Sequence, residues 1–171
     1  MPTPILILSG PVAAGKTTVA RELVRLLTDD VVLMEGDVFW SFFVNGAQGP
    51  THKRFRTIMS AMTAAAIPYA TGGSRVILDF SIPPWFLDTV RKIAAMRAVP
   101  LDYVVVRPSE QVCAARARER AEGRIADYSQ YRELYRDFDQ VARYIVCDDS
   151  MSAAETAAAI LRGVELGQFR L

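Results

Sequence analysis

Five short runs of apolar residues, rich in valine, isoleucine and leucine, are spaced along the 171-residue chain. Polar residues do not alternate with apolar ones inside these runs, which is typical of strands buried on both faces of a parallel sheet. The predicted strands are Ile5–Leu8, Val31–Met34, Val76–Leu78, Tyr103–Val106 and Tyr144–Val146. The pattern therefore predicts a five-stranded parallel sheet.

Stretches with helical character separate these runs. The predicted helices are Lys16–Leu27, Arg54–Ala70, Trp85–Ala98, Glu110–Glu122, Gln130–Val141 and Ala153–Gly163. Because strand and helix alternate throughout, we expect one α/β domain over residues 1–171, with helices on both faces of the sheet. Residues 38–72 are too many for a simple crossover, so we expect a helical insertion over the site there. Ser152 and Glu155 have the spacing of a capping box at the start of the last helix.

Composition and charge narrow the function classes. The hydrophobic share is 51% and the charged share 23%, and the formal net charge is only +1. Nucleic acid and anionic membranes are therefore unlikely partners, and any anion site must be local. No secretory signal and no apolar run of about 20 residues is evident, and two distant cysteines, Cys113 and Cys147, are typical of reduced thiols. We expect a cytoplasmic protein.

The segment after the first predicted strand has the form G-x-x-x-x-G-K-T and opens a predicted helix, which is the context that a phosphate-binding P-loop requires. Its backbone N–H groups and the helix N-terminus can hold the phosphates of ATP. Lys16 is expected to reach the β- and γ-phosphates, and Thr17 to bind Mg²⁺. The predicted nucleotide-binding residues are Gly10, Pro11, Val12, Ala13, Ala14, Gly15, Lys16, Thr17 and Thr18.

Two aspartates follow the next predicted strands, at the sheet edge where ligands bind in open α/β folds. Asp37 is the candidate that accepts the proton of an attacking hydroxyl, or orients that hydroxyl, and Asp79 is the candidate Mg²⁺ ligand. The two could exchange these roles. Each could also be structural, Asp37 as the cap of a helix that starts near Phe39 and Asp79 as a strand-end residue bonded to nearby backbone.

Arginines are dense in the helix predicted from Glu110. Arg116, Arg120 and Arg124 recur every four residues and share one face for as long as the helix continues. We expect residues 110–141 to form a lid from which Arg116 and Arg120 neutralise the transferring phosphoryl group, with Arg116 also contacting the nucleotide. The alternative is a solvated helix face whose arginines pair with glutamates.

The predicted insertion carries the candidate acceptor-binding residues. Trp40 could cover an organic substrate, and Arg54 could receive an anionic group. The alternatives are that the aromatic stripe around Trp40 belongs to the core and that the basic run from Lys53 to Arg56 is a solvated face. His52 is the only histidine and has no identifiable nucleophile partner.

With these motifs in place, the chain resembles the small P-loop kinases of nucleoside-monophosphate-kinase-like fold. This group includes chloramphenicol phosphotransferase, gluconate and shikimate kinases, zeta toxins and polynucleotide kinase. The resemblance implies that Lys16 and Thr17 bind ATP and Mg²⁺, that Asp37 is the catalytic base, and that Arg116 and Arg120 are lid arginines. It also implies that the loop at 148–152 borders the adenine.

Three departures leave the subfamily open. Asp37 is followed by Val38-Phe39-Trp40 and not by the arginine of adenylate-type kinases. Glu35-Gly36-Asp37 replaces the D-x-D pair of shikimate kinases, and the R-x-x-H-F run of gluconate kinases is absent after Arg120.

The sequence thus predicts an ATP- and Mg²⁺-dependent kinase that transfers the γ-phosphoryl group to a hydroxyl of a small molecule, such as an antibiotic, a sugar or a related metabolite. An ATP-dependent switch that acts on a protein partner is one alternative. A GTPase is excluded, because the sole asparagine, Asn45, is followed by Gly46 and no N-K-x-D element exists. A polynucleotide 5′-hydroxyl kinase is a further alternative, disfavoured by the near-neutral charge. The acceptor and the oligomeric state are not indicated.

Overall fold

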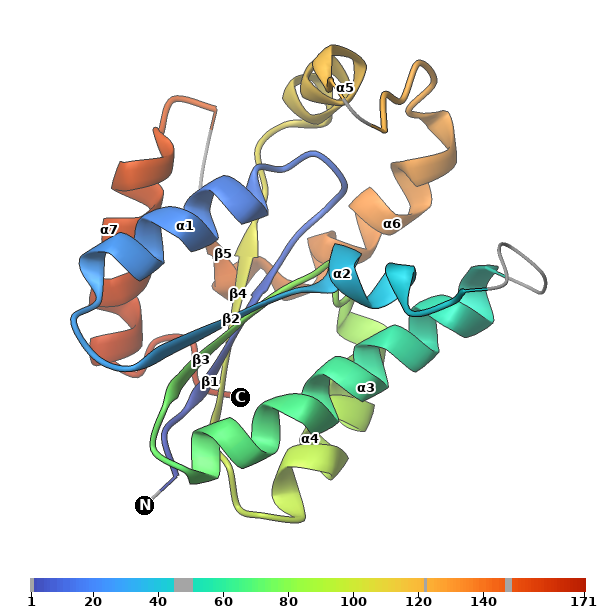
Figure 1. Cartoon of the computed structure of the whole chain (residues 1–171). Coiled ribbons are helices and arrows are strands. Elements are labelled where there is room, and N and C mark those ends of the chain that lie inside the picture. Colours follow the sequence, from blue (N-terminus) through green and yellow to red (C-terminus); the bar gives the residue numbers. More distant parts are fainter. Residues whose placement is uncertain (1, 45–50, 122, 147–148) are drawn as a thin grey trace.

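The computed structural model describes residues 2–44, 51–121, 123–146 and 149–171 (Figure 1). Its sheet has five strands in the order β2-β3-β1-β4-β5, and every pair of neighbours is parallel, as predicted. The strands are β1 (Ile5–Ser9), β2 (Val31–Glu35), β3 (Arg75–Asp79), β4 (Leu101–Val106) and β5 (Ile145–Val146).

Burial explains why the apolar runs located the central strands well. In β1, Ile7 pairs in register with Leu78 of β3 and with Tyr103 of β4, and all three side chains are fully buried. The edge strand β5 has only two residues, and the predicted strand residue Tyr144 instead ends the preceding 3₁₀ helix. An edge strand pairs with only one neighbouring strand, so the length of its apolar run predicts the length of the strand less well.

Helices cover both faces of the sheet (Figure 1). One face carries α1 (Lys16–Leu26) and α7 (Ala153–Glu165), which pack against each other, and the other carries α3 (Thr51–Thr71) and α4 (Leu87–Ala95). The capping box of α7 is confirmed, since Ser152 Oγ accepts from the Glu155 N–H at 3.2 Å and the Glu155 carboxylate accepts from the Ser152 N–H at 2.8 Å. Among the described residues, no helix combines the length and the apolar character that a membrane span requires.

The long helix α3 belongs mainly to the core. Met59, Met62 and Ala66 in its middle are fully buried, and the helix packs on α4 and β3. Only its first turns and the short helix α2 (Gly36–Ser41) stand over the carboxyl edge of the sheet. The predicted loop at 46–50 lies outside the described residues.

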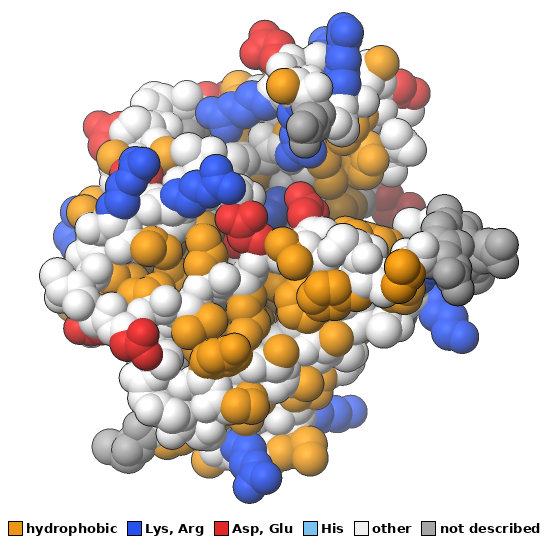
Figure 2. Space-filling view, in the orientation of Figure 1, with side chains coloured by type: hydrophobic (Ala, Val, Ile, Leu, Met, Phe, Trp, Pro, Cys, Tyr) orange, Lys and Arg blue, Asp and Glu red, His pale blue; other side chains and the backbone are white. Residues whose placement is uncertain are grey.

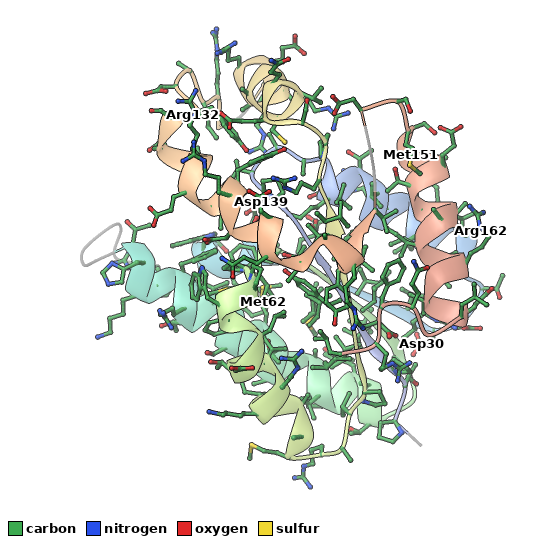
Figure 3. All side chains as sticks on the ribbon, turned by 180° about the vertical axis from the view of Figure 1, so that it is seen from behind. Asp30, Met62, Arg132, Asp139, Met151 and Arg162 are labelled. Atoms are coloured by element: carbon green, nitrogen blue, oxygen red, sulfur yellow. The ribbon has the colours of Figure 1, made fainter. Side chains whose placement is uncertain are left out.

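The segment after β4 forms shorter helices than predicted. Helix α5 (Glu110–Glu119) ends early because Arg120 adopts an extended conformation, with ψ of 133°. The predicted helix Gln130–Val141 is divided into η2 (Ser129–Tyr131), α6 (Arg132–Asp137) and η3 (Phe138–Tyr144). Seen from behind, Arg132 marks the start of α6 and Asp139 lies in η3, on the opposite side of the sheet from Arg162 of α7 (Figure 3).

Candidate active site

The P-loop between β1 and α1 has a backbone that favours glycine and small residues. Gly10 has φ of +140°, and a Cβ at this position would lie 2.1 Å from the carbonyl oxygen of Val106 in β4. Ala13 and Gly15 also have positive φ, of 61° and 95°. Left-handed residues interspersed in a loop turn its N–H groups toward one another and create an anion-binding concavity. The loop therefore fits the phosphates that the motif predicted.

Lys16 lies at the first position of α1 and folds back over the loop. Its Nζ donates to the carbonyl oxygens of Gly10 at 3.2 Å and Pro11 at 2.9 Å. Burial lowers the pKa of Lys16, and the carboxylates of Asp79 and Asp37 oppose that shift. The ammonium group is thus positioned by the loop itself, with two carboxylates within electrostatic reach.

Thr17 and Asp79 form the predicted pair for Mg²⁺. The Thr17 hydroxyl donates to Asp79 Oδ2 at 2.6 Å, across 62 residues of sequence. Asp79 ends β3 and is only 5% exposed, and burial raises its pKa against the opposing effects of Lys16 and Thr17. The described residues include no cluster of three or more His, Cys, Asp or Glu that would bind a metal alone. A hydroxyl and a carboxylate suit Mg²⁺, which takes its other ligands from phosphate and water.

Asp37 lies in the first turn of α2 and is exposed to the cavity. The N-cap of this helix is Glu35, without a side-chain cap bond, so the alternative of Asp37 as a helix cap is wrong. Among the residues that the structure describes, the Asp37 carboxylate has no hydrogen bond or ion pair. Asp37 is thus open to solvent and ligand while its charge acts on Lys16 and Asp79.

Two of the arginines from the predicted lid reach the cavity. Arg116 donates from Nη1 to the carbonyl oxygen of Ala14 at 3.1 Å, and Arg120 lies close enough to lower the pKa of Lys16 further. Because α5 ends at Glu119, before the predicted end at Glu122, Arg124 lies beyond this helix.

These groups line one cavity of about 970 Å³. Thr18 and Trp40 line it, while Arg54 does not and instead places its guanidinium 4.9 Å from the ring centre of Phe43. On the face of the molecule seen in Figure 2, acidic side chains are grouped near the centre, beside hydrophobic side chains that gather over α2. Sequence reasoning did not single out several other lining residues, which come from five separate segments: Arg21, Glu35, Phe55, Phe80, Ser81, Ile125, Tyr131 and Leu134.

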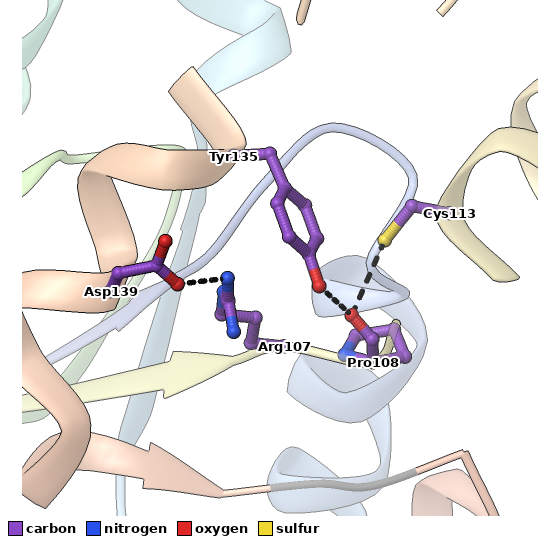
Figure 4. A network of polar contacts seen from close by, with 5 residues as sticks. All are labelled: Arg107, Pro108, Cys113, Tyr135 and Asp139. Carbon is purple, nitrogen blue, oxygen red and sulfur yellow. Dashed lines mark hydrogen bonds and ion pairs between the residues drawn. The ribbon is translucent and has the colours of Figure 1, made fainter. Parts of the chain in front are cut away.

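The segment predicted to form a lid is tied to the phosphate loop and to β4. Tyr128, after α5, donates its hydroxyl to the carbonyl oxygen of Val12 at 2.7 Å. At the end of β4, the Arg107 guanidinium lies 4.2 Å from the ring centre of Tyr135 and pairs with Asp139 (Figure 4). The Tyr135 hydroxyl donates to the Pro108 carbonyl oxygen at 2.9 Å. These contacts fix α6 beside the cavity.

The same network contains Cys113, which is buried and weakly bonded through its sulfur to the Pro108 carbonyl oxygen at 3.9 Å. Burial raises the pKa of Cys113 to about 11, so its thiol is protonated at neutral pH and is a poor nucleophile. Cys147 and Asp148 lie outside the described residues, and the expected role of the 148–152 loop at the adenine stays a prediction.

Comparison with known proteins places this site in a family. A family model described as an AAA domain matches residues 5–148. Over 80 residues, the chain is 32% identical to the shikimate kinase of Pasteurella multocida, a stretch that spans 42% of this chain and 46% of that protein.

Two solved structures are similar over nearly the whole chain. The APS kinase of Mycobacterium tuberculosis has a TM-score of 0.72 at 16% identity and covers 96% of this chain and 98% of its own. The tunicamycin resistance protein of Deinococcus radiodurans has a TM-score of 0.70 at 15% identity and covers 98% of both chains. At these identities the likeness concerns the fold. Because the family model covers most of the chain, including the P-loop and both site aspartates, the chain belongs to the AAA domain family and has the fold of small P-loop kinases.

Proposed function

We propose that this protein is an ATP- and Mg²⁺-dependent kinase that transfers the γ-phosphoryl group to a hydroxyl of a small molecule, such as an antibiotic, a sugar or a related metabolite. One observation carries the proposal. A single cavity contains the P-loop lysine, the Thr17–Asp79 pair and the unpaired carboxylate of Asp37.

On the donor side, the P-loop backbone and Lys16 would hold the phosphates, and Thr17 with Asp79 would hold Mg²⁺. ATP with Mg²⁺ supplies the phosphoryl group and neutralises part of its charge when bound. Arg116 and Arg120 line the same cavity from the lid and can stabilise the negative charge of the transferring group. Arg116 lies against the loop, since a Cβ on Gly15 would be 3.4 Å from its Nη1.

On the acceptor side, Asp37 can accept a hydrogen bond and then the proton from an alcohol. Its carboxylate is free of protein partners among the described residues and faces the cavity that contains Lys16. An exposed carboxylate is suited to orient a hydroxyl in line with the phosphoryl group.

The relatives are consistent with small-molecule phosphorylation. The similar stretch of 80 residues belongs to a shikimate kinase, and the M. tuberculosis APS kinase was solved in complex with AMPPNP and APS. The near-neutral net charge offers no general attraction to a polynucleotide.

The test is a phosphotransfer screen with ATP and Mg²⁺ across hydroxylated metabolites and antibiotics, followed by Asp37→Asn. We expect this substitution to lower the turnover of a positive acceptor by about 100- to 10,000-fold, the usual contribution of a general base. The affinity for ATP should stay within about twofold, because among the described residues Asp37 makes no hydrogen bond to the P-loop. The matched control is Asp88→Asn, since Asp88 also lies in the first turn of a helix, α4, but outside the cavity.

Full turnover in Asp37→Asn contradicts the role of this residue. ATP turnover that no alcohol stimulates, but that a protein partner does, contradicts the kinase proposal and supports the switch.

A further inference from the structure

The acceptor half of the cavity differs in chemistry from the phosphate half. We infer that the acceptor is an uncharged alcohol with an aromatic or similarly flat apolar body, and that the site discriminates against acceptors that carry a carboxylate or a phosphate. This inference rests on the proposed function and names the substrate class of the same site.

The side chains that line the cavity beyond the phosphate loop include a set that we call the apolar wall. It is contributed by α2, the start of α3, the end of β3 and the segment around α6, and consists of Trp40, Phe55, Phe80, Ile125, Tyr131 and Leu134. The rings of Phe55 and Phe80 pack at 5.3 Å between centres. Gly36 permits this arrangement, because a Cβ there would lie 2.0 Å from the Phe80 ring. Aromatic walls of this kind bind flat apolar groups, with a few polar atoms setting orientation.

The cations that line the cavity lie on the phosphate side or at its rim. Lys16 and Arg116 donate to P-loop carbonyl groups, and Arg120 lies within electrostatic reach of Lys16. Arg21 of α1 forms an ion pair with Glu35 at 3.3 Å. None of these groups belongs to the apolar wall.

The basic residues of α3 do not supply a cation to the wall either. Arg54 stacks on Phe43, and Arg56 places its guanidinium 4.6 Å from the ring centre of Trp85. Neither they nor Lys53 line the cavity. The residues outside the described ranges contain no lysine or arginine, so all lysine and arginine side chains of the protein belong to the described residues.

The charges that remain on the acceptor side are negative. Glu35 and Asp37 line the cavity next to the wall, and Glu35 alone has an arginine partner. His52 also lines this part of the cavity. An acceptor with its own anionic group would face these carboxylates and the phosphates of ATP without a counter-charge, an arrangement that selects against it. The acceptor would thus differ from shikimate, which carries a carboxylate.

The experiment compares pairs of arylalkyl alcohols that differ only by a carboxylate on the ring, with the full chain, ATP and Mg²⁺. Phosphate esters are measured by mass spectrometry, and acceptor binding by calorimetry with a non-hydrolysable ATP analogue present. We expect kcat/KM of the uncharged member to be at least ~10-fold higher, because the carboxylates of the cavity repel the carboxylate of the other member. The uncharged member should also bind with the higher affinity.

A positive charge added beside the wall should remove most of this preference. His52→Arg introduces a cation that lines the cavity, and should lower the ratio between the uncharged and carboxylated members by about tenfold, the effect of supplying the missing partner. Tyr69→Arg is the matched control, since Tyr69 is on the same helix, is 49% exposed and lies outside the cavity. It adds the same charge and should leave the ratio unchanged.

A carboxylated member that binds and reacts better in the wild-type protein overturns this inference and leaves the kinase proposal standing. An equal shift in both arginine variants also overturns it, because the selectivity would then depend on net charge and not on the wall. If ATP binds and only acceptors without an aromatic body, from the screen of hydroxylated metabolites and antibiotics, yield a phosphate ester, this inference alone is overturned. If no alcohol of either set yields a phosphate ester, the proposed function itself is overturned.

Discussion

Gly10→Ala tests how the P-loop is held against the sheet. The new Cβ would lie 2.1 Å from the carbonyl oxygen of Val106, and this oxygen belongs to the backbone of a central strand, which cannot move aside as a flexible side chain can. Gly10 also has φ of +140°, which disfavours any residue with a Cβ. The substitution therefore combines a conformational penalty with a steric overlap.

Gly73→Ala separates these two effects. Gly73 follows α3 with φ of +98°, but a Cβ there would have no neighbour within 4 Å. The left-handed conformation alone should lower the free energy of unfolding by about 1–2 kcal/mol. At Gly10, overpacking should add ~1–3 kcal/mol to a penalty of that size.

The assay is urea unfolding followed by circular dichroism, with the affinity for ATP measured in parallel. We expect Gly10→Ala to lose roughly 1–3 kcal/mol more than Gly73→Ala, at a similar dependence on urea. The affinity for ATP should fall only in Gly10→Ala, since relief of the overlap moves the loop away from β4. Equal destabilisation of the two variants, with unchanged ATP binding, would refute this account of the loop.

Two further predictions concern the buried groups of the site. Thr17→Ala removes the donor to Asp79, so it should lower the free energy of unfolding by about 1–3 kcal/mol and abolish the Mg²⁺-dependent increase in ATP affinity. Thr17→Ser keeps the hydroxyl and should retain most of the stability and most of the Mg²⁺ effect. Equal losses in the two variants, measured by denaturation and calorimetry, would argue against a role of the hydroxyl. Burial raises the pKa of Cys113 to about 11. At pH 8 the thiol of the native protein should therefore react with iodoacetamide far more slowly than the thiol of the urea-unfolded protein, as peptide mapping can measure. Rapid labelling of the native protein would contradict the burial of this thiol.

The sheet was predictable because its central strands are in an apolar environment on both faces. β1 and β3 are buried on both faces, so an unbroken apolar run located them to within two residues, and Asp79 was correctly placed at the end of its strand. The end of α5 was not predictable in the same way. Alanine, arginine and glutamate all favour helix around Arg120, and the extended conformation of that residue precedes a chain reversal that depends on the lid as a whole.

The meeting of the P-loop with Asp37 and Asp79 at one cavity was also predictable, since the P-loop is contiguous in sequence and strand ends meet at one edge of the sheet. The orientation of Arg54 was not, because a position on a helix does not show which of two neighbouring grooves a long side chain enters. Arg54 contacts an aromatic ring outside the cavity, while Phe55, the next residue, lines it. The members of the apolar wall are far apart in the chain, and only tertiary packing brings them together.

The end of β3 explains why the donor side can be constant while the acceptor side varies. Asp79 holds Thr17 of the P-loop, and the next residue, Phe80, packs on Phe55 and against Gly36. One peptide bond therefore links the Thr17–Asp79 pair to the apolar wall. Substitutions in α2 or at the start of α3 can reshape the wall without moving Asp79, because the core half of α3 and the central strands hold β3 in place. A fold built in this way can change its acceptor and keep its phosphate chemistry, which is why the sequence indicates the donor far more clearly than the acceptor.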